Sequence, residues 1–228
     1  MRVRAPKTGK EFLVEPADWG PHVDTGRVAD LSPGLMDDLG IGTDDEVEIE
    51  FAAGAKTVVI SSGHGLKIRG ASGELDEVDE ARRVVSTVAE ILTENGCTVW
   101  EFHDDTSTTQ EENLETIVEY HNSLERDLDI SVHFNAYHET NDPMGTECLY
   151  LTQSTLAKEV ASTIATEGDL IDRGPKQRTN LYFLKNTTAP AILIEVCFVD
   201  SSYDANAYRD NFVRICQGIA DVIYPPSV

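Results

Sequence analysis

Apolar and β-branched runs alternate with amphipathic stretches from residue 57 to the end of the chain. The predicted strands are "TVVIS" from 57, "CTVWEF" from 97, "ISVHFNA" from 130, "TECLYL" from 146, "NLYFL" from 180 and "AILIEVCFV" from 191. The predicted helices cover residues 76–94, 110–126, 154–167 and 204–223. Strands that alternate with helices predict an α/β fold, with a mostly parallel twisted sheet and helices on both faces.

Residues 1–53 follow a different pattern, which is rich in turn-forming residues. Segments such as "DWGPH", "LSPG" and "LGIGTDD" precede the alternating "EVEIEF". The short "AAGAK" at 52–56 then predicts a joint between two parts of the chain. We therefore expect a small β-rich N-terminal module at residues 1–53 and an α/β domain at residues 54–228.

The balance of charges restricts the partners. Among 228 residues, 18 are Lys or Arg and 41 are Asp or Glu, which gives a net charge of −23. Nucleic-acid affinity comes largely from basic contacts to phosphate, so we expect no nucleic-acid partner. No stretch approaches the ~18 uncharged apolar residues of a transmembrane helix. The basic start of the chain lacks a following apolar segment, so we expect neither a signal peptide nor membrane insertion.

Two histidines fall near the ends of predicted strands. His64 stands between two glycines directly after "TVVISS", and His133 lies within "ISVHFNA". Strand alternation puts His133 and Asn135 on one face of the sheet. A lone histidine is more often a satisfied core or surface residue, but ligands of parallel α/β sheets bind beyond the carboxyl ends of the strands. The two histidines together therefore indicate a common site.

A single charge interrupts the last predicted strand. Glu195 lies in the middle of "AILIEVCFV", an apolar run typical of a central parallel strand. Burying a carboxylate without a partner is costly. We therefore expect Glu195 to be paired, bound to a metal or protonated, and a bridge to an arginine would be a purely structural role.

A catalytic zinc site commonly uses two histidines and one carboxylate. We expect the carboxylate near the start of the first predicted helix of the α/β domain. The segment after His64 offers five acidic residues, Glu74, Asp76, Glu77, Asp79 and Glu80. Acidic residues are also common in a first helical turn, where they favour the helix dipole. Asp76 fits an N-cap, and Glu77 begins the buried stripe of the helix, so we expect Glu77 to point toward the sheet. Glu74 and Glu80 stay open alternatives.

Four motifs, "SSGHG", "LDEVDEA", "SVHFNA" and "ILIEVCFVDS", together resemble the zinc-dependent N-acetylmuramoyl-L-alanine amidases of the amidase-3 type. Such enzymes occur in autolysins and phage endolysins, and the resemblance covers residues 56–224 in motif order and spacing. It implies that His64, Glu77 and His133 bind one zinc ion and that Glu195 is the catalytic acid and base. The implied reaction is hydrolysis of the amide that joins N-acetylmuramic acid to L-alanine in bacterial peptidoglycan.

The substrate groove is less well defined by the resemblance. The segments "GLKIRGASGEL" and "FHDDTS" depart from the common family pattern. Asn135, His103 and His138 are candidate substrate-binding residues, because each lies on or just after a predicted strand that leads to the site.

The N-terminal module has a separate resemblance. "DWGPHVDTGRVADLSPGLMDDLGI" is similar to the later half of a double-psi β-barrel of the kind found in rare lipoprotein A. Residues 1–53 are too few for the whole barrel, so we expect a partial barrel or a short β appendage. Such a module could attach the chain to virion or wall proteins.

Two other functions stay open. A zinc carboxypeptidase or other cell-wall peptidase usually has its first ligands as H-x-x-E, whereas "HGLK" has lysine at that place. A non-catalytic wall-binding or virion component would not need all four key side chains. Because no signal peptide is expected, we predict a phage endolysin or virion-associated lysin that stays in the host cytoplasm until its release to the wall.

Overall fold

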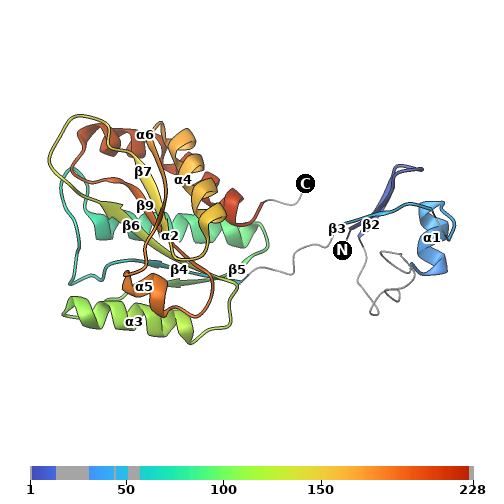
Figure 1. Cartoon of the computed structure of the whole chain (residues 1–228), viewed down its shortest axis with the longest axis horizontal. Coiled ribbons are helices and arrows are strands. Elements are labelled where there is room, and N and C mark those ends of the chain that lie inside the picture. The colour runs from blue at the N-terminus through green and yellow to red at the C-terminus, as the bar shows by residue number, and fades with distance from the viewer. Residues whose placement is uncertain (1, 14–30, 44, 51–56, 226–228) are drawn as a thin grey trace. The chain divides into compact units, whose positions relative to one another are not determined.

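The computed structural model describes residues 2–13, 31–43, 45–50 and 57–225, and the chain forms two compact units, Met1–Gly54 and Ala55–Val228 (Figure 1). The predicted joint at 52–56 and residues 18–30 of the barrel-like segment lie outside the described residues. The barrel resemblance therefore stays a prediction. No helix within the described ranges combines the length and hydropathy that crossing a membrane requires.

The N-terminal unit is an antiparallel sheet with a short helix. Its described elements are β1 (Arg2–Ala5), β2 (Lys10–Leu13), α1 (Pro33–Leu39) and β3 (Glu48–Glu50), and the strand order is β2-β1-β3. Ser32 caps α1 by accepting a hydrogen bond from the Leu35 N–H at 3.2 Å, and Gly40 ends the helix with a left-handed φ of 72°. A small cluster of buried apolar side chains packs this unit: Val3, Ala5 and Leu39.

The second unit contains a six-stranded sheet in the order β5-β4-β6-β9-β7-β8. Its strands are β4 (Thr57–Ser62), β5 (Thr98–Phe102), β6 (Leu128–Asn135), β7 (Thr146–Tyr150), β8 (Asp172–Gln177) and β9 (Ala191–Phe198). Its helices are α2 (Glu77–Glu94), α3 (Gln110–Asn122), α4 (Ser154–Gly168), α5 (Tyr182–Asn186) and α6 (Ser202–Ile223). Neighbouring strands run parallel except β7 and β9, which are antiparallel. The predicted α/β fold with a mostly parallel sheet is confirmed.

Helices cover both faces of this sheet (Figure 1). The larger apolar core joins the sheet to α2, α4 and α6, and a smaller core joins it to α3 and α5. In β9, Ile192 and Ile194 contribute to the larger core while Ala191 and Leu193 contribute to the smaller one. This alternation is the period-two pattern of a strand that is buried on both faces.

One predicted strand is wrong. Within "NLYFL" from residue 180, the segment Tyr182–Asn186 forms the short helix α5, whose Phe183 and Leu184 are buried in the smaller core. The missing strand is β8, "DRGPKQ", which has no apolar pattern and pairs with β7 at the edge of the sheet. An edge strand has only one pairing neighbour and tolerates the proline at position 175, because its lost N–H need not join a ladder.

Candidate metal centre and active site

His64 lies just beyond the carboxyl end of β4. The strand pairing continues one residue further, because the Gly63 N–H donates to the Val132 carbonyl oxygen at 2.9 Å. After His64 the chain turns back, and the Leu66 N–H donates to the Asp104 carbonyl oxygen at 2.8 Å. The backbone on both sides of the imidazole is therefore fixed by hydrogen bonds.

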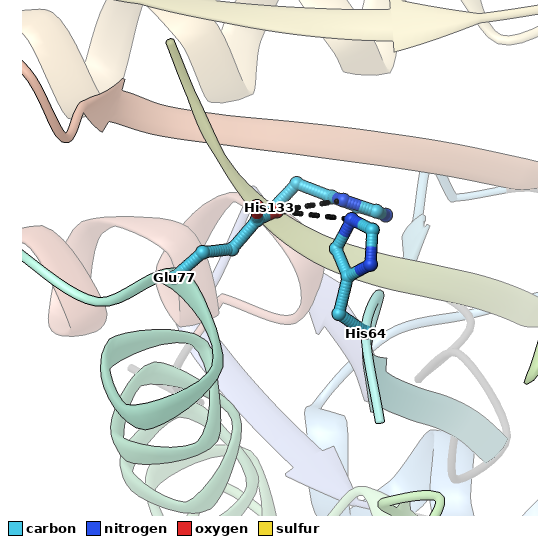
Figure 2. A group of neighbouring side chains, drawn as sticks. All are labelled: His64, Glu77 and His133. Atoms are coloured by element: carbon cyan, nitrogen blue, oxygen red, sulfur yellow. Dashed lines mark hydrogen bonds and ion pairs between the residues drawn. The ribbon is translucent and has the colours of Figure 1, made fainter. Parts of the chain in front are cut away.

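Three side chains meet at this edge of the sheet: His64, Glu77 from the first turn of α2 and His133 from β6 (Figure 2). Glu77 Oε1 lies 3.0 Å from His133 Nδ1 and 3.6 Å from His64 Nε2. The two imidazole rings are 5.2 Å apart and nearly perpendicular, at 81°. One potential ligand atom from each residue lies within 4.8 Å of the others. The three candidate zinc ligands are thus brought together.

The Glu77 carboxylate is held by the backbone on both of its oxygens. Its Oε2 accepts a hydrogen bond from the Ala71 N–H at 2.7 Å, and its Oε1 accepts one from the Phe134 N–H at 3.2 Å. Asp76 caps α2, as predicted, by accepting from the N–H groups of the second and third helical residues. This cap starts the helix at Glu77, which is only 3% exposed.

The alternative carboxylates lie elsewhere. Glu80 accepts a hydrogen bond from the Tyr208 hydroxyl at 2.8 Å and pairs with Arg83. Glu74 is exposed, and its hydrogen bonds are made by its backbone, which donates to the Val199 carbonyl oxygen and accepts from Arg209. Of the acidic residues in this segment, only Glu77 lies close enough to the two histidines to bind the same metal ion.

Two glycines leave room for the three side chains. A Cβ atom on Gly63 would lie 1.8 Å from His133 Nε2. A Cβ on Gly70, whose φ is +68°, would lie 2.3 Å from Glu77 Oε2 and 2.6 Å from His64 Cδ2. Any larger residue at either position would displace a candidate ligand. The sequence showed the glycines but did not show which side chains they would meet.

Glu195 lies beside this cluster. It is the register partner of His133 on β6 and of Glu147 on β7. Its Oε2 is buried and has no hydrogen-bond partner among the described residues. Burial raises the pKa of Glu195 to about 7, and the negative charges of Glu77 and Glu147 add to this rise, although His133 opposes it. The structural alternative was a bridge from Glu195 to an arginine, and no arginine of the described residues pairs with Glu195; Arg173 pairs instead with its neighbour Glu147.

The protonation states of His64 and Glu77 suit metal binding, whereas His133 must lose a proton to become a ligand. Burial lowers the pKa of His64, and the neighbouring His133 lowers it further. Burial alone would raise the pKa of Glu77, but its hydrogen bond with His133 and the charges of both histidines outweigh burial and lower the pKa. Near neutral pH the site therefore offers an ionised carboxylate at Glu77 and a neutral imidazole with a free lone pair at His64. Burial alone would lower the pKa of His133, but its hydrogen bond with Glu77 and the charges of Glu195 and Glu77 raise it, so a metal ion would displace a proton from this ring.

The candidate substrate residues on and after β6 lie at different depths. Asn135 donates from Nδ2 to Glu147 Oε1 at 3.4 Å. Because Glu147 lies opposite Glu195 on the neighbouring strand, this bond puts the Asn135 amide close to Glu195. His138 is exposed, and its ring lies 4.7 Å from the ring of Tyr137, which is 77% exposed. Asn135 is therefore adjacent to the candidate centre, whereas His138 lies on the surface of the following loop.

His103 supports the turn that carries His64. Its Nδ1 lies 3.0 Å from Ser62 Oγ, and this hydroxyl donates to the His64 carbonyl oxygen at 3.1 Å. A hydroxyl that uses its one hydrogen in this way accepts the other bond, so His103 carries its proton on Nδ1. The structure thus places His103 behind His64, where it positions the turn.

A second histidine cluster is fully buried. His121 bonds to Asp129 Oδ1 through Nδ1 at 2.8 Å and to Ser61 Oγ through Nε2 at 2.9 Å, and Arg126 also pairs with Asp129. Ser61, His121 and Asp129 are each 0% exposed, so no substrate can reach this serine despite its triad-like order. Both ring nitrogens of His121 are used in this network.

Two imidazoles and two carboxylates thus lie together at the carboxyl ends of β4, β6 and β9. This arrangement is typical of metal-dependent hydrolases with an α/β fold. Residues 58–224 match the family described as N-acetylmuramoyl-L-alanine amidase, Amidase_3, and the chain belongs to this family. The resemblance indicated by the four sequence motifs is confirmed.

Similar proteins with known sequences occur in Clostridium perfringens and Staphylococcus aureus. The chain is 32% identical to an uncharacterized 38.4 kDa protein of Clostridium perfringens over 158 residues, which cover 67% of this chain and 46% of that protein. It is 27% identical to the probable cell wall amidase LytH of Staphylococcus aureus over 164 residues, or 70% of this chain and 53% of LytH. The chain therefore spans about half the length of these relatives.

Solved structures share the fold of the second unit. The catalytic domain of the CD27L endolysin, which targets Clostridia Difficile, has a TM-score of 0.69 at 22% identity, with 76% of this chain and 99% of that domain covered. The catalytic domain of CwlV, an N-acetylmuramoyl-L-alanine amidase from Bacillus (Paenibacillus) polymyxa var. colistinus, has a TM-score of 0.64 at 30% identity. In that case 74% of this chain and 96% of the domain are covered.

Proposed function

We propose that this protein is a zinc-dependent peptidoglycan hydrolase, which cleaves the amide bond between N-acetylmuramic acid and the L-alanine of the stem peptide. The observation that carries the proposal is the convergence of His64, Glu77 and His133 beside the buried Glu195, in a chain of the N-acetylmuramoyl-L-alanine amidase family.

The donor set of these three side chains fits zinc. Catalytic zinc sites use three protein ligands, among them the combination of two histidines and one glutamate. Ligand atoms about 2.0–2.1 Å from a tetrahedral ion lie about 3.3 Å from one another. The two separations from Glu77 Oε1, 3.0 Å to His133 and 3.6 Å to His64, bracket this value. Hydrogen bonds from backbone N–H groups fix the carboxylate, as metal ligands generally require.

Zinc, when bound, supplies a Lewis acid that polarises a carbonyl and lowers the pKa of a water molecule. The chain's own contribution to the reaction is proton transfer by Glu195. This carboxylate would take a proton from the water that attacks the scissile carbonyl carbon. It would then deliver a proton to the L-alanine nitrogen as the carbon–nitrogen bond breaks. Its raised pKa suits both steps, because an acid and base is most effective when its pKa is near the working pH.

Digestion of purified peptidoglycan tests the proposal. The whole chain is incubated with cell walls before and after removal of metal by a chelator, and again after zinc is restored. Mass spectrometry of the soluble products should find stem peptides with a free L-alanine amine, only when metal is present. The Glu195→Gln variant is the matched control, because it should keep zinc and release no peptide.

The other functions make different products. A cell-wall peptidase would cut within the stem peptide and leave L-alanine attached to the sugar. A binding component would release nothing from any wall, with or without zinc. Either result would overturn the amidase proposal.

The setting of the enzyme is a separate proposal. We infer a phage endolysin or virion-associated lysin in which residues 1–53 contact wall or virion proteins, and the sequence resemblances alone support this. Immunodetection of the chain in purified phage particles and in induced host cells tests it. A protein found only in the walls of uninfected bacteria would contradict it.

A further inference from the structure

A row of ionisable side chains extends the candidate active site across four strands. His133 on β6 is the register partner of Glu195 on β9, and Glu195 is the register partner of Glu147 on β7. Arg173 on β8 donates from Nε to Glu147 Oε2 at 3.0 Å. Residues directly opposite one another on neighbouring strands project from the same face of a sheet. The row therefore leads from the candidate metal centre to a cation two strands beyond Glu195.

The guanidinium of Arg173 is held in one orientation. Besides the bond to Glu147, its Nη1 donates to the Met144 carbonyl oxygen at 3.2 Å, and its planar group lies over the Phe198 ring at 5.0 Å. Nη2 donates to no atom of the described residues, and the side chain is 38% exposed, so a ligand in solution can reach this nitrogen. An oriented guanidinium with an unused nitrogen is thus open to solvent at the end of the row.

We propose that Arg173 binds a carboxylate of the stem peptide and so favours acidic peptides over amidated ones. This inference rests on the proposed amidase function. Arginine is the residue best suited to hold a carboxylate, because its fixed donors match the geometry of the anion. Strands lie ~4.8 Å apart, so Arg173 is about 10 Å from Glu195 along the row, or about three residues of extended peptide. The ligand is therefore a carboxylate on the second or third residue after the scissile amide.

A simpler role for Arg173 would be neutralisation of Glu147, which is only 6% exposed. That role requires one contact, and Nε already makes it. The Met144 and Phe198 contacts orient the rest of the guanidinium, which neutralisation alone does not need. The two roles differ in a measurable way, because only a substrate-binding arginine distinguishes a carboxylate from a carboxamide.

Binding measurements with peptides that cannot be cleaved test the proposal. The probes are two synthetic tripeptides that begin with L-alanine and differ only in whether the acidic groups of the second and third residues are carboxylates or carboxamides. Isothermal titration of the zinc-loaded whole chain should give about 10-fold or greater preference for the carboxylate peptide. Arg173→Gln should reduce this preference to less than about twofold, whereas Arg173→Lys, which can still pair with Glu147, should keep part of it.

Arg178→Gln is the matched control. Arg178 lies just past the other end of β8 and is exposed, and among the described residues its side chain bonds only the carbonyl oxygen of its neighbour Gln177. The control loses the same charge and should keep the full preference. Equal affinity of the wild type for both peptides, or an undiminished preference in Arg173→Gln, would overturn the inference. Failure to release peptides from peptidoglycan would instead overturn the proposed function, so the two failures are distinguishable.

Discussion

Replacement of Gly63 by alanine should disable the candidate metal centre without unfolding the protein. The new Cβ would lie 1.8 Å from His133 Nε2, 2.0 Å from Cε1 and 2.3 Å from Cδ2. Gly63 does not have a left-handed φ, so alanine suits its backbone. The backbone itself is tied to β6 by the hydrogen bond from the Gly63 N–H to Val132. The imidazole of His133 must therefore move.

The size of the movement follows from these distances. Ordinary contact with a Cβ begins at 3.4 Å, so the ring must retreat by about 1.6 Å from its 1.8 Å approach. Metal sites tolerate deviations of only about 0.2 Å in ligand distance. We expect zinc affinity to fall about 100-fold or more, and kcat/KM about 100-fold, which corresponds to ~2.7 kcal/mol in transition-state stabilisation. Overpacking of the site should cost about 1–3 kcal/mol of folding free energy.

Zinc affinity is measured by competition with a chelator of known affinity, and activity by release of stem peptides. Thermal unfolding of the metal-free protein should show a shift of only a few degrees. Gly34→Ala is the matched control, because a Cβ there meets nothing within 4 Å and the position has no left-handed φ. A Gly63→Ala protein that binds zinc and cleaves peptidoglycan as the wild type does would refute the reasoning.

Three further predictions concern the carboxylates. Glu195→Gln should lower kcat/KM by about 10²–10⁴ while zinc content stays at the wild-type level, as steady-state kinetics and metal analysis would reveal. Because the pKa of Glu195 is raised from 4.5 to about 7, the folded, metal-free protein retains a proton there that the unfolded chain has lost. Its free energy of unfolding should therefore fall, by about 3 kcal/mol, as pH rises through this window. Urea titrations should show no such contribution in Glu195→Gln. Glu77→Gln should lose zinc and Glu80→Gln should keep it; equal zinc in both would exclude Glu77 as the carboxylate ligand.

Most elements of the second unit were predictable because their patterns are local. The apolar residues of α2 recur at steps of three and four, and the structure buries them: Val78, Ala81, Val85, Val88 and Leu92. The apolar run of β9 likewise reflects burial on both faces. By contrast, β8 has no apolar pattern, since its position depends on backbone pairing with β7 at the sheet edge. A sequence pattern reports burial, and an edge strand of polar residues has little of it.

The positions of His64, Glu77 and Glu195 in the candidate site were predictable for a related reason. His64 and Glu195 each interrupt an apolar strand or its end, and a polar group in such a place requires a partner. The choice of Glu77 followed from helix periodicity, which sets the direction of its side chain. His121 interrupts its pattern in the same way, yet its partners are Ser61 and Asp129 in the core. A pattern identifies a buried polar group, but only the fold decides whether solvent reaches it.

The positions of Glu147 and Arg173 beside the candidate site depend on the direction of one strand, β7. A parallel sheet would place Glu147, near the start of β7, at the edge opposite the carboxyl end of β9. Because β7 runs antiparallel to β9, its first residues lie beside Glu195 instead, and β8 follows β7 in the same direction. The reversal therefore brings both Glu147 and Arg173 to the candidate active site. Local sequence does not encode this reversal, since the run "TECLYL" is compatible with either direction. Arg173, which we propose to select the peptide, and its partner Glu147 thus lie beside the centre only because of the topology of the sheet.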